Sequence, residues 1–275
     1  MTDNQFQISV SQNFLYHQQL ASFKWMLHGF SLRFDPELKR DLNLGLNDYQ
    51  PAEIVLENRK KLALSVSGIE IPLVTLRQIH SDRIIVLTNN KPFATTPEGD
   101  AMITDQAGML LAIQTADCLP VLMIDPSRKV IAAIHAGWRG LLKRILMKTI
   151  EKMQKDYSTI PGDCLAVIGP GIGPCCYKVG EEMVHEFTKA FVGGNFFFRD
   201  LTQKDSNSPK TRSLDLIAAA KCQLLESGVL PRSIFGYEDC TGCRTDLFFS
   251  HRAEGERTGR MMSVIGIKGV HGMVN

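Results

Sequence analysis

Two histidines and one cysteine close short segments of this chain and are of types that bind metal ions. His80 closes Gln-Ile-His, Cys118 closes Thr-Ala-Asp-Cys, and His135 stands in Ala-Ile-His-Ala-Gly-Trp-Arg-Gly. Two imidazoles and one thiolate can hold zinc while a fourth coordination position stays open, and an open position is typical of catalytic zinc sites. The three residues therefore predict a catalytic metal centre, provided that the fold brings them together.

The segments in front of two of these residues favour such a convergence. Cys118 follows the apolar run 109–115, and His135 closes the run 130–134, each with a turn residue close behind it. Apolar runs of this length, bounded by turn residues, are typical of buried strands. Strand ends that open into loops commonly carry the sites of α/β proteins. The wide spacing alone leaves open the alternative that each is an ordinary core residue.

Overall charge and hydropathy limit the classes of partner. Lys and Arg number 31 against 29 Asp and Glu, so the formal net charge is only +2. Without a dense basic block, nucleic acid is not expected as a partner. No apolar stretch reaches the ~18 residues of a membrane span, and the N-terminus lacks the pattern of a signal peptide. We therefore expect no membrane partner and a cytoplasmic location.

The cysteines are expected to be buried, metal-bound or reactive thiols. Seven cysteines without a signal peptide argue against a disulfide framework. Cys240-x-x-Cys243 could be half of a zinc ribbon or a redox pair, but no second pair stands at a matching spacing, so two ordinary thiols in a turn are favoured. Cys175 and Cys176 precede an expected helix, and a thiol at a helix N-terminus has a lowered pKa.

Two further stretches could bind anions. Gly169-Pro-Gly-Ile-Gly-Pro lies between an expected strand and an expected helix, but its G-x-G-x-G spacing and its prolines disfavour a dinucleotide-binding loop. Its backbone amides could still form a nest around a ligand. The stretch 251–260 is either a solvated loop or an anion-binding one; its arginines are Arg252, Arg257 and Arg260.

Two aspartates stand close to the expected metal ligands. Asp117 directly precedes Cys118, and Asp100 opens Asp-Ala-Met-Ile-Thr. Each is either a turn residue or a carboxylate that orients a ligand imidazole, as carboxylates beside zinc-bound histidines commonly do.

Hydrophobic periodicity predicts alternating strands and helices. Strands are expected at 25–34, 83–87, 109–115, 119–124, 130–135, 165–168 and 261–267, and helices at 51–67, 140–154 and 180–191, with a further helix capped by Ser213 that runs through Leu225 and ends at Gly228. The stretch 193–212 is expected to be irregular. We expect an N-terminal tail over 1–20 and one α/β (α+β) domain over 21–275, with a mixed β-sheet flanked by helices.

A series of motifs in this chain resembles the YfiH/LACC family, whose members were called multicopper polyphenol oxidases and later purine nucleoside phosphorylases. The motifs are Arg-Gln-Ile-His at 77–80, Gly-Asp-Ala-Met-Ile-Thr-Asp at 99–105, Gln-Thr-Ala-Asp-Cys-Leu-Pro at 114–120, His-Ala-Gly-Trp-Arg-Gly at 135–140, Ile-Gly-Pro-Gly-Ile-Gly-Pro-Cys-Cys-Tyr at 168–177 and Thr-Gly-Arg at 258–260. They occur in family order, and the resemblance extends from about Gly29 to Ile267.

The resemblance implies a single YfiH-like domain with zinc, or alternatively Cu²⁺, held by His80, Cys118 and His135. It implies phosphorolysis of adenosine, inosine, guanosine and methylthioadenosine to free base and ribose 1-phosphate, together with deamination of adenosine. The expected partners are thus purine nucleosides and phosphate, and the expected assembly is a monomer or homodimer. In one departure from the family, the glycine-rich loop after the His-Gly-Phe-Ser segment is replaced by Leu-Arg-Phe-Asp-Pro, with Arg33 retained.

Five residues are expected at the substrate. They are Arg139, Asp117, Gly171, Cys176 and Arg33. Arg139 is the best candidate for phosphate, because a guanidinium grips phosphate in bidentate fashion. The His-x-Glu and Pro-Cys-x-x-Cys signature of cytidine-type zinc deaminases is absent, so the general acid for deamination has to come from elsewhere, and Asp117 is the candidate.

Three alternatives stay open at this point. A cysteine hydrolase could use Cys118 as nucleophile with His80 or His135 as base. A copper-dependent phenol oxidase would need more histidines than the 7 present. A structural zinc protein is disfavoured because it would need four ligands.

Overall fold

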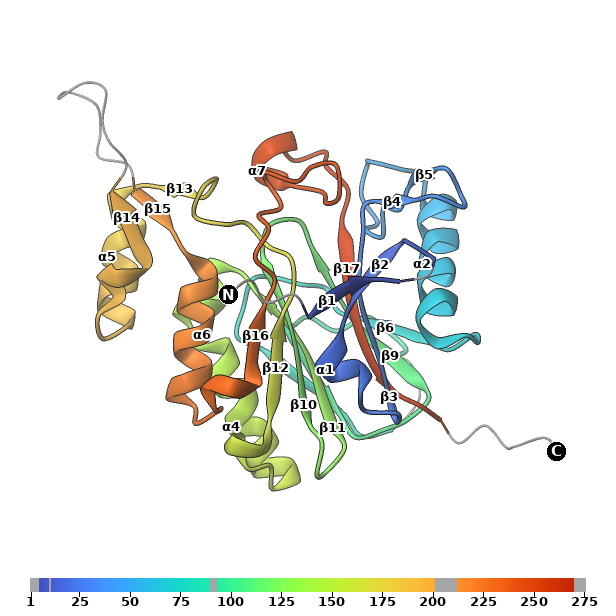
Figure 1. The fold of residues 1–275 in the computed structure, drawn as a ribbon, viewed down its shortest axis with the longest axis horizontal. Coiled ribbons are helices and arrows are strands. Elements are labelled where there is room, and N and C mark those ends of the chain that lie inside the picture. Colours follow the sequence, from blue (N-terminus) through green and yellow to red (C-terminus); the bar gives the residue numbers. More distant parts are fainter. Residues whose placement is uncertain (1–4, 10, 90–92, 201–211, 270–275) are drawn as a thin grey trace.

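Two six-stranded mixed sheets form the centre of the computed structural model, which describes residues 5–9, 11–89, 93–200 and 212–269 (Figure 1). The first sheet runs in the order β1 (Phe6–Ile8), β2 (Phe14–His17), β3 (Met26–Ser31), β17 (Met261–Ile267), β9 (Met109–Thr115), β6 (Leu73–Thr75). The second runs in the order β16 (Ile234–Gly236), β12 (Leu165–Ile168), β10 (Leu119–Asp125), β11 (Val130–Ala136), β8 (Ala101–Thr104), β7 (Ile84–Leu87).

Helices cover the outer faces of the two sheets. Helix α2 (Ala52–Ser67) packs on the first sheet, whereas α4 (Ile145–Tyr157) and α6 (Leu216–Glu226) pack on the second, as Figure 1 shows. The smaller elements are α1 (Gln18–Ala21), α3 (Trp138–Leu142), α5 (Glu181–Ala190), α7 (His251–Glu254), the hairpin of β4 (Phe34–Asp35) and β5 (Arg40–Asp41), and the small sheet of β13 (Lys178–Val179), β15 (Arg212–Leu214) and β14 (Phe198–Asp200). The result is a four-layer helix, sheet, sheet, helix arrangement.

The unbroken apolar runs of the central strands follow from this layering. In β11, Ala132 and Ile134 join the core under α4 and α6, while Ile131 and Ala133 join the core between the sheets. Side chains alternate between the two faces of a strand, so a strand covered on both faces is apolar at every position. This is why the runs show no polar alternation.

The expected α/β (α+β) class is confirmed, whereas a single mixed sheet proves to be two. The segment 1–20, expected as a tail, contributes β1 and β2, and β2 pairs with β3. Apolar side chains of β2 explain the difference, because Phe14 and Leu15 are buried in the cores on either side of the first sheet.

Three local expectations also differ from the structure. The helix expected at 140–154 is broken between α3 and α4, where Arg144 adopts a left-handed conformation with φ of 64°. Helix α6 is capped by Asp215, whose carboxylate accepts from the Ala218 amide, while Ser213 lies in β15. The stretch 193–212 contains β14 and the start of β15, and residues 201–211 lie outside the described residues.

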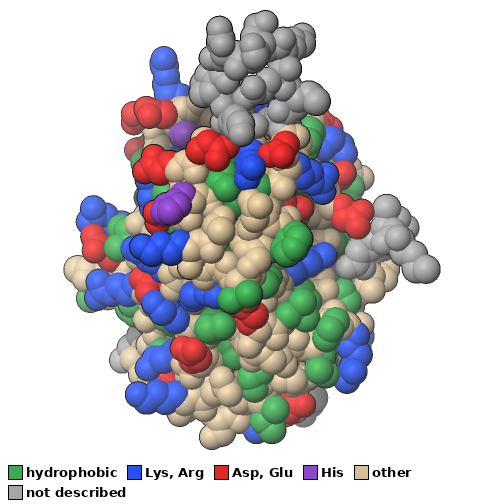
Figure 2. All heavy atoms as spheres, turned by 90° about the vertical axis from the view of Figure 1, so that its left-hand side faces the viewer, with side chains coloured by type: hydrophobic (Ala, Val, Ile, Leu, Met, Phe, Trp, Pro, Cys, Tyr) green, Lys and Arg blue, Asp and Glu red, His purple; other side chains and the backbone are tan. Residues whose placement is uncertain are grey.

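On the face of the molecule that carries α5 and α6, basic and acidic side chains are interspersed rather than gathered into a block of one sign (Figure 2). Within the described residues, no helix combines the length and the apolar character that a membrane span requires.

Side chains buried in the core between the sheets should contribute strongly to stability. Leu111 of β9 is completely buried there, so Leu111→Ala should lower the free energy of unfolding by about 2–5 kcal/mol through lost burial and the cavity that remains. Leu56→Ala, at a position of α2 that is 51% exposed, is the matched control and should change stability little. Urea unfolding followed by circular dichroism measures both, and equal effects would contradict this assignment of the core.

Candidate active site

The candidate metal ligands lie where the chain passes from one sheet to the other. His80 lies in the connection from β6 of the first sheet to β7 of the second. Cys118 lies in the connection from β9 of the first sheet to β10 of the second. His135 is near the end of β11, directly opposite Pro120 of β10 in the antiparallel pair. All three are thereby placed at the same end of the sandwich.

The three ligand atoms are close enough to share one ion. One ligand atom from each of His80, Cys118 and His135 lies within 4.8 Å of the others, and Cys118 Sγ is 3.9 Å from His80 Nε2. Atoms about 2.0–2.3 Å from a tetrahedral zinc ion lie roughly 3.3–3.8 Å apart. The donor set and its spacing therefore fit a zinc-sized ion with an open position.

The carboxylate of Asp100 holds both histidine-bearing segments. His135 Nδ1 donates to Asp100 Oδ1 over 2.8 Å, which leaves Nε2 of the imidazole free for a metal. The same carboxylate accepts from the backbone amides of His80 at 3.0 Å and Ser81 at 2.6 Å, and from the Ser81 hydroxyl at 2.6 Å. Asp100 thus orients the imidazole of His135, a candidate ligand, and this is the placement that one of its two interpretations requires.

A missing side chain makes room for the centre. A Cβ atom at Gly137 would lie 2.9 Å from Cys118 Sγ and 3.3 Å from His80 Cδ2. Only glycine therefore fits at this position of the His-Ala-Gly-Trp-Arg motif without moving the candidate ligands. His80 itself has φ of 55° and Asp117 has φ of 89°, an uncommon left-handed conformation for residues other than glycine.

The charges at the centre reinforce one another. Burial opposes ionisation of the Cys118 thiol, but the positive charge and hydrogen bond of His135, with help from His80, lower its pKa to about 6. Burial also opposes the charge on His135, yet Cys118 and Asp100 raise the pKa of His135 to about 9. For Asp100, burial is again outweighed by His135 and Ser81, and the pKa falls to about 2. Near neutral pH, the protein without metal therefore holds a thiolate beside an imidazolium.

A cavity of about 670 Å³ opens onto the three ligands. Its wall includes four arginines, one acidic residue and two aromatic rings; these are Arg77, Arg139, Arg252, Arg260, Asp117, Trp138 and Tyr177. The excess of positive charge suits an anionic ligand, and the rings offer apolar faces to a planar one.

Two residues expected at the substrate line this cavity. Arg139 is exposed, and its guanidinium stacks on the ring of Trp138 at 4.2 Å. The carboxylate of Asp117 accepts from the hydroxyls of Thr241 at 2.6 Å and Ser250 at 2.7 Å, and from the Arg252 amide at 2.6 Å. Asp117 therefore connects the 240–252 region to the Cys118 loop. Within the described part of the chain, its carboxylate forms no hydrogen bond with an imidazole.

The other three residues expected at the substrate are not among the described residues that line the cavity. Gly171 packs its backbone near Asp117, and Cys176 turns its sulfur to Cys243, 3.4 Å away. Arg33 pairs with Asp41 at 3.2 Å and with Glu254 at 2.6 Å. Through Glu254, Arg33 supports α7 next to the cavity wall.

The expected helix-entrance position of Cys175 and Cys176 is wrong. They lie in a turn before β13, and α5 begins only at Glu181. Partial desolvation, followed by contacts with Cys243 and Cys240, raises the pKa of Cys175 to about 11 instead of lowering it.

Several residues of the cavity wall were not predicted from the sequence. Gln78, Tyr177 and His251 line the cavity, although they were not singled out. Each lies within or next to a motif that was quoted, so proximity to the motif was the available signal. In the stretch 251–260, Arg252 and Arg260 line the cavity, and anion binding by this stretch stays a prediction.

The thiolate and imidazolium pair can be measured directly. In chelator-treated protein, alkylation of Cys118 by iodoacetamide should increase with pH with a midpoint of about 6, because the thiolate is the nucleophile. In His135→Gln, the midpoint should move to higher pH, and added zinc should protect Cys118 in the wild type. Mass spectrometry of the Cys118 peptide gives the rate, with Cys222 as the internal control. A wild-type midpoint at an ordinary thiol pKa would contradict the ion pair.

Comparisons with known proteins identify the family of this chain. The chain is 36% identical over 235 residues to purine nucleoside phosphorylase YlmD of Geobacillus stearothermophilus, covering 82% of this chain and 83% of the relative. It is 32% identical over 219 residues to adenosine deaminase RL5 of an unknown prokaryotic organism, covering 77% and 81%. The crystal structure of YlmD superposes with a TM-score of 0.85 at 32% identity, covering 96% of this chain and 99% of that one. A family model described as multi-copper polyphenol oxidoreductase laccase matches residues 28–268, and this chain therefore belongs to that family.

Proposed function

We propose that this protein is a zinc-dependent purine nucleoside phosphorylase that also deaminates adenosine. The observation that carries the proposal is the His80, Cys118 and His135 centre at an arginine-lined cavity. Relatives named purine nucleoside phosphorylase and adenosine deaminase support the same activities. The cavity volume of about 670 Å³ lies in the range of small-molecule sites and suits a nucleoside with phosphate.

Zinc is the proposed metal because of the donor set. A thiolate with two imidazoles favours a borderline-soft ion, and three protein ligands leave a position for catalysis. When bound, the ion supplies a Lewis acid that can polarise a substrate oxygen or activate water. His80, Cys118 and His135 would hold it, with Asp100 fixing the tautomer of His135.

Phosphorolysis requires that phosphate be held against the ribose C1′ while the purine leaves. Among the arginines of the wall, Arg252 donates to the Lys178 carbonyl at 2.7 Å, and Arg260 donates to carbonyls of its own loop. Within the described residues, no carboxylate pairs with Arg139, whose guanidinium stacks on Trp138. Its donors are therefore available, and we assign the phosphate contact to Arg139.

The apolar part of the cavity provides the complementary surface for the purine and ribose. Ile172, Leu216 and the ring of Tyr177 line it. Planar bases pack well against aromatic and aliphatic faces, because their rings gain dispersion contacts and lose contact with water. Tyr177 is itself fixed by the guanidinium of Arg252, which lies 4.9 Å from the ring centroid.

A second candidate function rests on a specific observation. Cys118, His135 and Asp100 form a thiolate, imidazolium and carboxylate series, which is the arrangement that cysteine hydrolases use. The two functions make opposite demands on the sulfur, since a thiolate bound to zinc is not free to attack a substrate. Metal dependence of turnover therefore separates them.

The decisive experiment follows products of zinc-loaded protein by chromatography. Adenosine, inosine and methylthioadenosine should each release free base only when phosphate is present, and adenosine should also give inosine. Cys118→Ser should abolish turnover together with zinc binding at this centre, because one of three ligands is lost, whereas Cys222→Ser on α6 should behave as wild type. Turnover by chelator-treated protein would favour the hydrolase, and turnover by Cys118→Ser would contradict the zinc assignment.

The phosphate contact has its own test. Arg139→Ala should raise the KM for phosphate roughly 10- to 100-fold, because a hydrogen bond to a charged group contributes about 1.5–3 kcal/mol, and should change the KM for nucleoside much less. Arg232→Ala removes an exposed arginine outside the cavity lining and serves as the control. An unchanged phosphate KM in Arg139→Ala would remove this residue from the site.

A further inference from the structure

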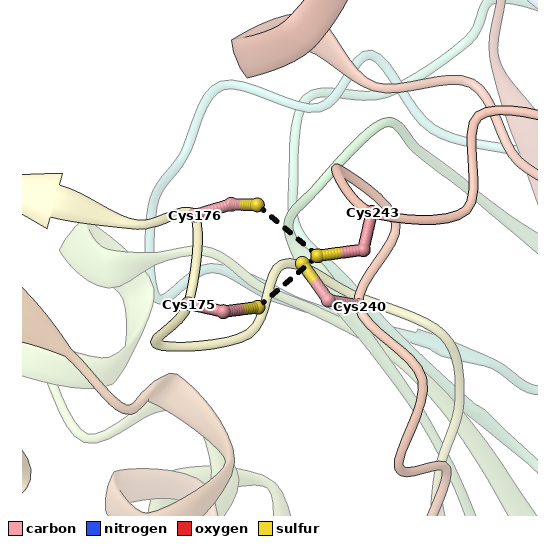
Figure 3. A group of neighbouring side chains, drawn as sticks. All are labelled: Cys175, Cys176, Cys240 and Cys243. Carbon is pink, nitrogen blue, oxygen red and sulfur yellow. Dashed lines mark hydrogen bonds between the residues drawn. The ribbon is translucent and has the colours of Figure 1, made fainter.

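Four cysteines that do not line the described cavity lie close together in a cluster of their own. Cys175 and Cys176 come from the turn before β13, and Cys240 and Cys243 come from the loop after β16, with their sulfurs turned toward one another (Figure 3). Cys243 Sγ lies 3.4 Å from the sulfurs of both Cys175 and Cys176, and all four sulfurs lie within 4.8 Å of one another. The second pair that a zinc ribbon needs is thus supplied by the fold, as an adjacent Cys-Cys rather than a second Cys-x-x-Cys.

The spacing fits a shared ion better than covalent bonds. All seven cysteines are free thiols in the structure, and a disulfide would need sulfurs about 2.05 Å apart. Sulfurs about 2.3 Å from a tetrahedral zinc ion lie roughly 3.8 Å apart, close to the 3.4 Å contacts found here. Four mutually close thiols without a bonded partner therefore have the dimensions of a tetrathiolate site.

The backbone around the cluster is also shaped for it. A Cβ atom at Gly173 would lie 3.1 Å from Cys240 Cβ, and one at Gly242 would lie 3.0 Å from Cys176 Cβ. Each loop thus contributes a glycine where the opposite pair of cysteines approaches. The Gly173 amide also donates to Cys240 Sγ over 3.1 Å, a contact that stabilises a thiolate.

We propose that Cys175, Cys176, Cys240 and Cys243 bind a second zinc ion, in a closed structural site separate from the catalytic centre. Four protein thiolates fill a tetrahedral shell, so this ion has no position open for substrate. This proposal does not depend on the reaction that the cavity catalyses.

The site would link two loops that build the cavity wall. The loop of Cys175 and Cys176 leads directly into Tyr177, and the loop of Cys240 and Cys243 leads to His251 and Arg252. Without an ion, the two loops are joined nearby by the Thr241 amide, which donates to the Gly171 carbonyl at 3.0 Å. A bound zinc ion would add a cross-link between segments far apart in the sequence and fix the distance between the two parts of the wall.

Metal stoichiometry of the full chain tests the proposal. Protein purified with zinc and measured by native mass spectrometry and elemental analysis should carry two zinc ions per chain. Cys118→Ser and Cys243→Ala should each carry one, the double variant none, and Cys222→Ser should keep both. Because the two centres are counted separately, loss at one does not mask the other.

Replacing Cys243 by another metal ligand distinguishes the loss of zinc binding from a disturbance of the fold. Cys243 is exposed, and Cys243→His should restore the second zinc ion because imidazole replaces thiolate in many structural zinc sites. In the Cys118→Ser background, cobalt should give thiolate-to-metal absorption that weakens in Cys243→His and disappears in Cys243→Ala. A wild-type chain with only the Cys118-dependent ion, a second equivalent that survives Cys243→Ala, iron in place of zinc, or a disulfide within the cluster would each overturn the proposal.

Discussion

The buried carboxylate of Asp100 is the group on which the geometry of the centre depends. It is fully shielded from water and accepts from the imidazole of His135, from backbone amides beside His80 and from the Ser81 hydroxyl. A buried charge is tolerated only when such partners compensate for lost hydration. Because these donors come from the connection after β6 and from β11, one carboxylate positions the segments of two candidate ligands at once.

The two-sheet architecture explains why a site forms at this edge. The chain crosses between the sheets beside His80 and again beside Cys118, so both residues lie at the rim of the core that the sheets enclose. On β11, Ile131 and Ala133 face this core, and alternation turns His135 toward the same side. The apolar sandwich thus presents two candidate ligands on connections and the third on a strand, an arrangement that restricts their movement.

A second buried carboxylate forms part of the cavity wall. Asp117 adopts an uncommon left-handed conformation and accepts from Thr241, Ser250 and the Arg252 amide. Its charge is compensated by these hydrogen bonds, and among the described lining residues it is the one carboxylate beside four arginines. The same contacts hold α7, whose Glu254 pairs with Arg33. Two parts of the wall, α7 with Arg252 and the Cys118 loop, are therefore held by one hydrogen-bonded network.

The sequence by itself determined the core strands and the candidate ligands. The runs at 109–115, 119–124 and 130–135 are apolar at nearly every position because both faces are covered. The residue types of His80, Cys118 and His135 are ones that suit a borderline-soft metal. Local patterns carry no information about which strands share a sheet or which loops meet. For that reason the division into two sheets, the joint role of Asp100 and the meeting of Cys175 and Cys176 with Cys240 and Cys243 were decided only by the tertiary structure, where long-range pairing brings distant segments into contact.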